Sequence, residues 1–114
     1  MQMDNDASLE IFKLQAELCK SLADPKRLML IHELRNGSKS VADLAEALGL
    51  KQSNTSQHLA VLRRAGIVMT QRDGSTIYYS LVTAKIAMAR DTLREVIAEK
   101  LGRDQVLIDS ISNS

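Results

Sequence analysis

The feature that most constrains this chain of 114 residues is a run of seven polar residues, from Gln52 to His58. Leu59, Val61 and Leu62 follow the run at helical spacing, so the run is expected to begin a helix and not to be a linker. Polar side chains in this number cannot form a core. We therefore expect the helix to present hydrogen-bonding groups to a polar partner, and we interpret that partner as the base edges of DNA.

Two helices are expected before this region. The first begins at Ser8. The second begins at Asp24-Pro25, because Asp24 accepts hydrogen bonds from free backbone N–H groups and Pro25 needs no partner at the first helical position. The second helix is expected to end at Asn36-Gly37, with the glycine in a left-handed cap.

A third helix is expected to begin at Ser40 and to end at Gly49. The polar helix then runs from about Gln52 to Ala65. Two helices joined by a tight turn that contains glycine are the signature of a helix-turn-helix.

A hairpin and a last helix complete the pattern. The runs 67–73 and 76–81 favour strands, and Asp73-Gly74 between them is a strong hairpin signal because glycine tolerates positive φ. A helix follows over about 84–101. The predicted fold is therefore mainly α with a small β-hairpin, a winged helix-turn-helix in the order α-α-α-α-β-β-α.

The length predicts a single domain over residues 1–114, in which 1–7 and 103–114 are expected to be flexible tails. Asp4 and Asp6 replace the apolar run of a secretory signal, and no apolar stretch is long enough to cross a membrane, so we expect a cytoplasmic protein. The sequence contains no glycine-rich phosphate loop and no paired catalytic residues, so an enzyme is not predicted.

The distribution of charge indicates a nucleic-acid partner, although the net charge is only +1. No acidic residue occurs from 47 to 72, whereas four basic residues lie in that window. Such a window favours contact with phosphates. The four residues are Lys51, Arg63, Arg64 and Arg72.

A major groove admits one α-helix, and glutamine and asparagine each offer a paired donor and acceptor suited to adenine. Serine and threonine hydroxyls bond to bases or phosphates, and a histidine reaches a phosphate or a guanine edge. Gln52, Thr55 and Ser56 are expected to share one face of the helix, with the others flanking it. The predicted DNA-binding residues are Lys51, Gln52, Ser53, Asn54, Thr55, Ser56, Gln57, His58, Arg63, Arg64 and Arg72.

The chain resembles the ArsR/SmtB family of winged-helix repressors over about residues 9–100. The resemblance implies a homodimer built through the first and last helices, and repression by operator binding that an inducer relieves. The segments that carry the resemblance are Leu22-Ala-Asp-Pro-Lys-Arg-Leu28, Val41-Ala-Asp-Leu-Ala45, Ser56-Gln-His-Leu59, Leu62-Arg-Arg-Ala-Gly-Ile-Val68 and Gly74-Ser-Thr-Ile-Tyr-Tyr-Ser-Leu81.

Apolar stripes on the first and last helices favour the same dimer. A two-fold dimer places its recognition helices about 34 Å apart, so the expected partner is double-stranded DNA with a near-palindromic operator. The predicted interface residues are Leu9, Phe12, Ala16, Cys19, Leu93, Val96 and Ile97.

The chain departs from the family at its familiar metal sites. Ser40, Val41 and Ala42 occupy the place where family members carry paired cysteines in the third helix, so the thiolate ligands for a soft metal are missing. At the second site only Glu99 remains, and one carboxylate does not hold zinc. No metal site and no cofactor are predicted, and the inducer is unidentified.

Two alternatives to a repressor with an unidentified signal are open. Cys19 is the single cysteine, and we interpret it as a small buried hydrophobic residue. The alternative is a redox- or sulfur-responsive repressor in which Cys19 bonds to its symmetry mate across the dimer axis. The second alternative is a winged helix that binds another protein, which leaves the acid-free basic window unexplained.

Overall fold

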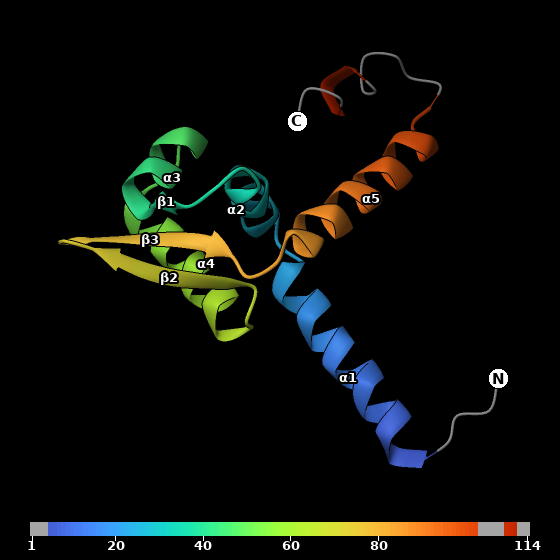
Figure 1. Cartoon of the computed structure of the whole chain (residues 1–114). Helices are drawn as coiled ribbons and strands as arrows, with labels where there is room; N and C mark the ends of the chain where they lie inside the picture. Colours follow the sequence, from blue (N-terminus) through green and yellow to red (C-terminus); the bar gives the residue numbers. More distant parts are fainter. Residues whose placement is uncertain (1–4, 103–108, 112–114) are drawn as a thin grey trace.

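The winged helix-turn-helix occupies one end of the molecule, and two long helices project from the other end (Figure 1). The computed structural model describes residues 5–102 and 109–111. The elements in chain order are α1 (Asn5–Leu22), α2 (Pro25–Leu34), β1 (Lys39–Ser40), α3 (Val41–Leu48), α4 (Gln52–Arg64), β2 (Val68–Asp73), β3 (Thr76–Leu81) and α5 (Ala84–Lys100).

The core lies where α2, α3, α4 and the start of β2 meet. It is entirely aliphatic, as the shortage of aromatic residues requires. Burial of these side chains supplies the main stabilisation of the domain, at about 1.5–3 kcal/mol for each large aliphatic residue. The buried core residues are Leu30, Ile31, Leu34, Leu44, Leu59, Leu62, Ile67 and Val68.

Local capping explains most helix boundaries. Asp24 caps α2, because its Oδ1 accepts from the backbone N–H of Lys26 at 2.8 Å. Ser40 caps α3, and Gly49 ends it in the left-handed conformation with φ +65°. Gly37 does not take the predicted left-handed cap: α2 ends three residues earlier, and Gly37 has φ +143° in the loop that follows.

The wing is an antiparallel hairpin of β2 and β3 closed by Gly74, which has φ +64°. A third strand, β1, was not predicted. Lys39 pairs with Tyr79 and Ser40 with Tyr78, so β1 joins the wing to the start of α3. Two residues are too few to show a strand periodicity in the sequence.

Parts of the two predicted tails are helical where the structure describes them. α1 begins at Asn5, so residues 5–7 are helical. Residues 109–111 are helical too, and Arg94 Nη1 on α5 donates to the carbonyl oxygen of Ile111 at 3.4 Å. Residues 1–4, 103–108 and 112–114 lie outside the described residues. None of the described helices is long and apolar enough to cross a membrane.

A bidentate ion pair holds α5 against α2. Arg35 Nη1 donates to Asp91 Oδ1 at 3.0 Å, and Arg35 Nη2 donates to Asp91 Oδ2 at 2.6 Å. Arg90 donates to the same carboxylate at 3.1 Å. The hydrogen bond from Arg35, reinforced by the charges of Arg35, Arg90 and Arg94, lowers the pKa of Asp91 below its ordinary value of 3.8, although desolvation opposes the change.

His32 lies beside this ion pair on α2. Burial, and then the positive charges of Arg90 and Arg35, lower the pKa of His32 below 6.5, although Glu33 and Asp91 oppose the change. Its Nδ1 atom is buried and has no partner among the described residues. The α2–α5 contact therefore holds its histidine in the neutral form at pH 7.

The low pKa of Asp91 predicts acid-sensitive stability. The carboxylate contribution is complete above pH 3.8 and is lost as the pH falls through the lower pKa of the folded state. Asp91→Asn is expected to lower the free energy of unfolding at pH 7 by up to about 1 kcal/mol, a small value because the ion pair is partly exposed. The difference in this free energy between wild type and variant shrinks towards pH 3. Urea unfolding at fixed protein concentration measures it, with Glu46→Gln on α3 as the control. A difference that persists unchanged at pH 2 contradicts the assignment.

Candidate nucleic-acid interface

The predicted recognition helix, α4, has two faces of opposite character. Leu59 and Leu62 are fully buried and anchor the helix in the core. The outward face carries only polar side chains in its first two turns, and these point away from the core because they fall between the buried positions of the 3.6-residue period. The exposed residues of these turns are Gln52, Ser53, Ser56 and Gln57.

Thr55 belongs to the buried face. Its side chain is fully buried, and its Oγ1 donates to the carbonyl oxygen of Lys51 at 2.9 Å. Thr55 precedes Leu59 by four residues and Leu62 by seven, so all three share the core side of the helix. The prediction that Thr55 contacts DNA, on the same face as the exposed glutamine and serine, is therefore wrong.

Asn54 and His58 flank the buried face and are half-buried. The Asn54 Oδ1 atom is buried and has no partner among the described residues. The His58 side chain is 16% exposed and lies against the corner between α1 and α2, where Arg27 Nη1 approaches His58 Nδ1 at 3.3 Å. The structure therefore separates His58 from the exposed polar residues of α4, with which the sequence analysis grouped it as a DNA-binding residue.

Three exposed arginines border the outward face. Arg63 and Arg64 occupy the last turn of α4, where a positive charge also interacts favourably with the helix dipole. Together with Ala60 and Tyr79 of the wing they line a shallow polar hollow between α4 and β3. Arg72 is exposed on β2, near the tip of the hairpin.

Lys51 stands at the other end of the helix. It is exposed at the N-cap position of α4, where no side chain caps the helix. The first turn of α4 therefore keeps free backbone N–H groups next to the exposed Lys51.

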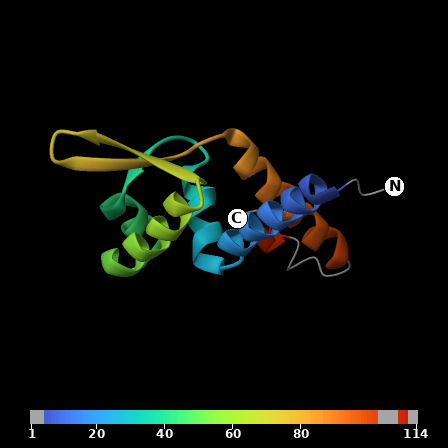
Figure 2. The same ribbon diagram turned by 90° about the horizontal axis from the view of Figure 1, so that it is seen from below.

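The predicted dimer residues are all exposed in the single chain. Phe12 on α1 is 50% exposed and Leu93 on α5 is 60% exposed. Both helices lie on the side of the molecule opposite the tip of the wing in each of two perpendicular views (Figures 1 and 2). Each projecting helix therefore displays an uncovered apolar stripe.

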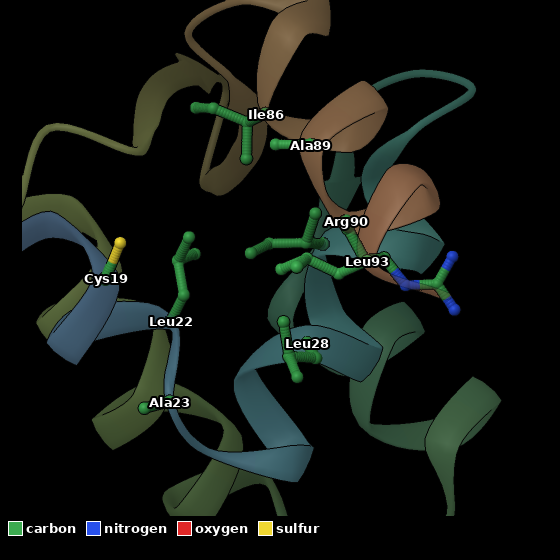
Figure 3. A pocket seen from close by; sticks show the side chains of 9 residues that line it. Cys19, Leu22, Ala23, Leu28, Ile86, Ala89, Arg90 and Leu93 are labelled. Carbon is green, nitrogen blue, oxygen red and sulfur yellow. The ribbon is translucent and has the colours of Figure 1, made fainter. Parts of the chain in front are cut away.

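An apolar pocket of about 220 Å³ opens between the end of α1, α2 and α5 (Figure 3). Leu22 and Leu28 line one side, and Ile86 and Leu93 line the other. Cys19 lines this pocket and is exposed in the single chain, so only the predicted dimer interface would bury it. Within residues 5–102 and 109–111, no three histidine, cysteine or acidic side chains gather as a potential metal site.

Comparison with known proteins identifies the family. A family model described as "Bacterial regulatory protein, arsR family" matches residues 24–70. The uncharacterised HTH-type transcriptional regulator Rv0081 of Mycobacterium tuberculosis is 40% identical over 99 residues, which cover 86% of each chain. This chain belongs to the arsR family of bacterial regulatory proteins. The biofilm growth-associated repressor of Xylella fastidiosa is 44% identical to this ArsR-family chain over 78 residues, 68% of each chain.

Solved structures agree with the fold. The crystal structure of Rv0081 is 41% identical with a TM-score of 0.73, covering 84% of this chain and 96% of that chain. The homodimeric winged helix-turn-helix domain Mb0332 of Mycobacterium bovis, solved by NMR, is 26% identical with a TM-score of 0.78, covering 90% and 95%. The ArsR-family chain is therefore a winged-helix transcriptional regulator and not an enzyme.

Two residues that contact α4 from the corner between α1 and α2 were missed by the sequence analysis. Arg27 and Asp24 contact the recognition helix through His58, although they lie about thirty positions earlier in the chain. Asp24 was identified only as a helix cap. No local pattern pairs residues at that separation.

The two faces of α4 predict different responses to the loss of a hydroxyl group. Thr55→Val is expected to change operator affinity less than twofold, because the residue is buried and the Lys51 carbonyl keeps its bond from the Thr55 N–H at 3.0 Å. Ser56→Ala removes a hydroxyl from the exposed face and is expected to cost about 0.5–1.5 kcal/mol of binding. Fluorescence anisotropy with labelled operator compares the two. Equal losses for both variants contradict the assignment of the faces.

Proposed function

We propose that α4 enters the major groove of an operator and reads base edges with the exposed polar residues of its first two turns. The observation that carries the proposal is the division of α4 into a buried aliphatic face and an exposed polar face. A helix in the major groove presents such a face to base edges, and glutamine suits adenine there. The proposed reading residues are Gln52, Ser53, Ser56 and Gln57, with the half-buried Asn54 at the edge of this face.

The phosphate backbone is held by basic groups at both ends of α4 and on the wing. Lys51 and the uncapped N–H groups of the first turn meet one phosphate segment, because a helix N-terminus attracts anions. Arg63 and Arg64 meet a second segment from the last turn. Arg72 reaches the backbone from the hairpin. These contacts are independent of sequence and make binding dependent on salt.

The regulator acts as a homodimer through α1 and α5. Exposed apolar residues on both helices support this interface, since a folded chain does not leave such stripes in water without a partner. A two-fold axis presents two copies of α4 to successive major grooves about 34 Å apart, so the operator is a near-palindrome. The proposed interface residues are Leu9, Phe12, Ala16, Cys19, Leu93, Val96 and Ile97.

We infer a repressor because a relative of 44% identity is named as a repressor, and a dimer bound to an operator blocks access to the DNA that it covers. Residues 1–114 form one domain. Because the proposed partner is DNA, we place the protein in the cytoplasm. The signal that releases the repressor from its operator is unidentified. The alternative function, binding to another protein, does not explain the exposed polar face of α4 or the arginines beside it.

Gln57→Ala tests the reading face. If Gln57 pairs bidentately with a base, the variant loses about 1–3 kcal/mol at the cognate operator, while non-specific binding and the salt dependence stay unchanged. Titration against the DNA upstream of its own gene, at several salt concentrations, measures both quantities. Thr55→Val on the buried face is the matched control. Indifference of binding to Gln57, Gln52 and Ser56 replaced together contradicts the proposal.

Leu93→Glu tests the dimer. A charge in the middle of an apolar interface is expected to shift the protein to a monomer, because an unpaired carboxylate is costly to bury. Operator affinity then falls to that of a single half-site. Sedimentation at matched concentrations measures the mass, with Met69→Glu on the wing as an equally exposed apolar control. A Leu93→Glu variant that sediments as the wild-type dimer rejects this interface.

A further inference from the structure

One arginine joins the end of α1, the start of α2 and the recognition helix. Arg27 lies in the first turn of α2, and its Nε donates to the carbonyl oxygen of Ser21 in the last turn of α1 at 2.6 Å. Its Nη1 lies 3.3 Å from His58 Nδ1 on α4. Because arginine has no acceptor, the Arg27 group is the donor in this bond, and the His58 proton then resides on Nε2.

Asp24 completes this corner from the turn between α1 and α2. Its Oδ1 accepts from the N–H groups of Lys26 at 2.8 Å and Arg27 at 3.3 Å, and it lies 4.0 Å from His58 Nδ1. Desolvation, the largest single influence, raises the pKa of Asp24. The two N–H bonds and the positive charge of Arg27 outweigh it, so the pKa of Asp24 is lowered and the carboxylate stays charged.

The contacts of residues 21–27 at the corner between α1 and α2 are important because α1 makes few other contacts with the core. Residues 9–20 of α1 are exposed, and only Leu22 at its end packs against the core. Figures 1 and 2 show α1 projecting from the body at this corner. The angle between α1 and α4 is therefore fixed at residues 21–27, where the Arg27 guanidinium spans both helices.

We propose that Arg27 and His58 are positioning residues that set the separation of the two recognition helices, and thereby the half-site spacing that the operator must have. The inference rests on the proposed dimer and its DNA-reading helix. In that dimer α1 belongs to the interface and α4 to the groove. The contact between Arg27 and His58 fixes the orientation of α4 relative to α1, and thereby the distance between the two copies of α4 in the dimer. That distance must match the spacing of the half-sites, which repeat with the helical turn of DNA, about 10–10.5 base pairs.

The competing explanation is that Arg27 or His58 contacts a phosphate directly. The two roles give different results. Loss of a phosphate contact weakens binding at every site and lowers the slope of log K against log salt by about 0.9. Loss of a positioning contact leaves a single half-site unaffected and keeps the slope, but it weakens the full operator and relaxes its spacing.

The experiment measures the affinity of the full-length protein for one half-site, for the full operator, and for operators with one base pair added or removed between the half-sites. Arg27→Met keeps the aliphatic stem and removes the donors. His58→Leu removes the acceptor, and His58→Asn restores one through its Oδ1 atom. Lys26→Met, at an exposed neighbouring position in α2, is the matched control.

Arg27→Met and His58→Leu are each expected to weaken the full operator about tenfold, the size of one hydrogen bond from a charged group. Half-site affinity stays within twofold, and the preference for the native spacing is largely lost. The double variant loses no more than either single variant, because both changes break one contact. His58→Asn and Lys26→Met behave as the wild type.

An equal loss at half-site and full operator with a lower salt slope overturns the proposal in favour of a phosphate contact. Unchanged spacing preference in both variants also overturns it. If Arg27→Met does not fold by circular dichroism, the comparison of His58→Leu with His58→Asn decides the question. A wild-type protein that binds no DNA rejects the proposed function, whereas one that binds without any spacing preference rejects only this inference.

Discussion

The structure depends on α4, which anchors the core with one face and, in the function that we propose, reads DNA with the other. Leu59 and Leu62 are fully buried, and each supplies about 1.5–3 kcal/mol of hydrophobic stabilisation. A helix fixed on one side in this way presents the opposite side at a constant orientation, which direct readout of base edges requires. Stability and the proposed DNA recognition therefore belong to opposite faces of the same thirteen residues.

In a single chain, α1 and α5 expose apolar residues that nothing covers. α1 contains 18 residues but is supported by the core only at its end. An isolated helix of that length is marginal in water, so its stability comes from packing against something. Together with the exposed stripe of α5, this predicts that the stability of the protein depends on protomer concentration.

Local chemistry made most of the fold predictable. Asp24-Pro25, Ser40, Gly49 and Gly74 act through their nearest neighbours, so their effects can be read from sequence. The site was predicted in part. The spacing of Thr55 from Leu59 was present in the sequence and assigns Thr55 to the core, but seven polar residues in a row obscured it. The His58 contact with Arg27 was not predictable, because it joins residues 31 positions apart and no periodicity reports it.

The segment from Ser21 to Leu28 contributes to two sites, because its apolar residues and its polar residues make different contacts. Leu22, Ala23 and Leu28 line the apolar pocket against α5, whereas Ser21, Asp24 and Arg27 make the polar contacts of the corner. Two surfaces are coupled when they share an element with two arrangements that each surface binds differently. The pocket therefore borders α4 in two ways, through this segment and through Ile31, which lines the pocket and packs with Leu59 and Leu62 in the core.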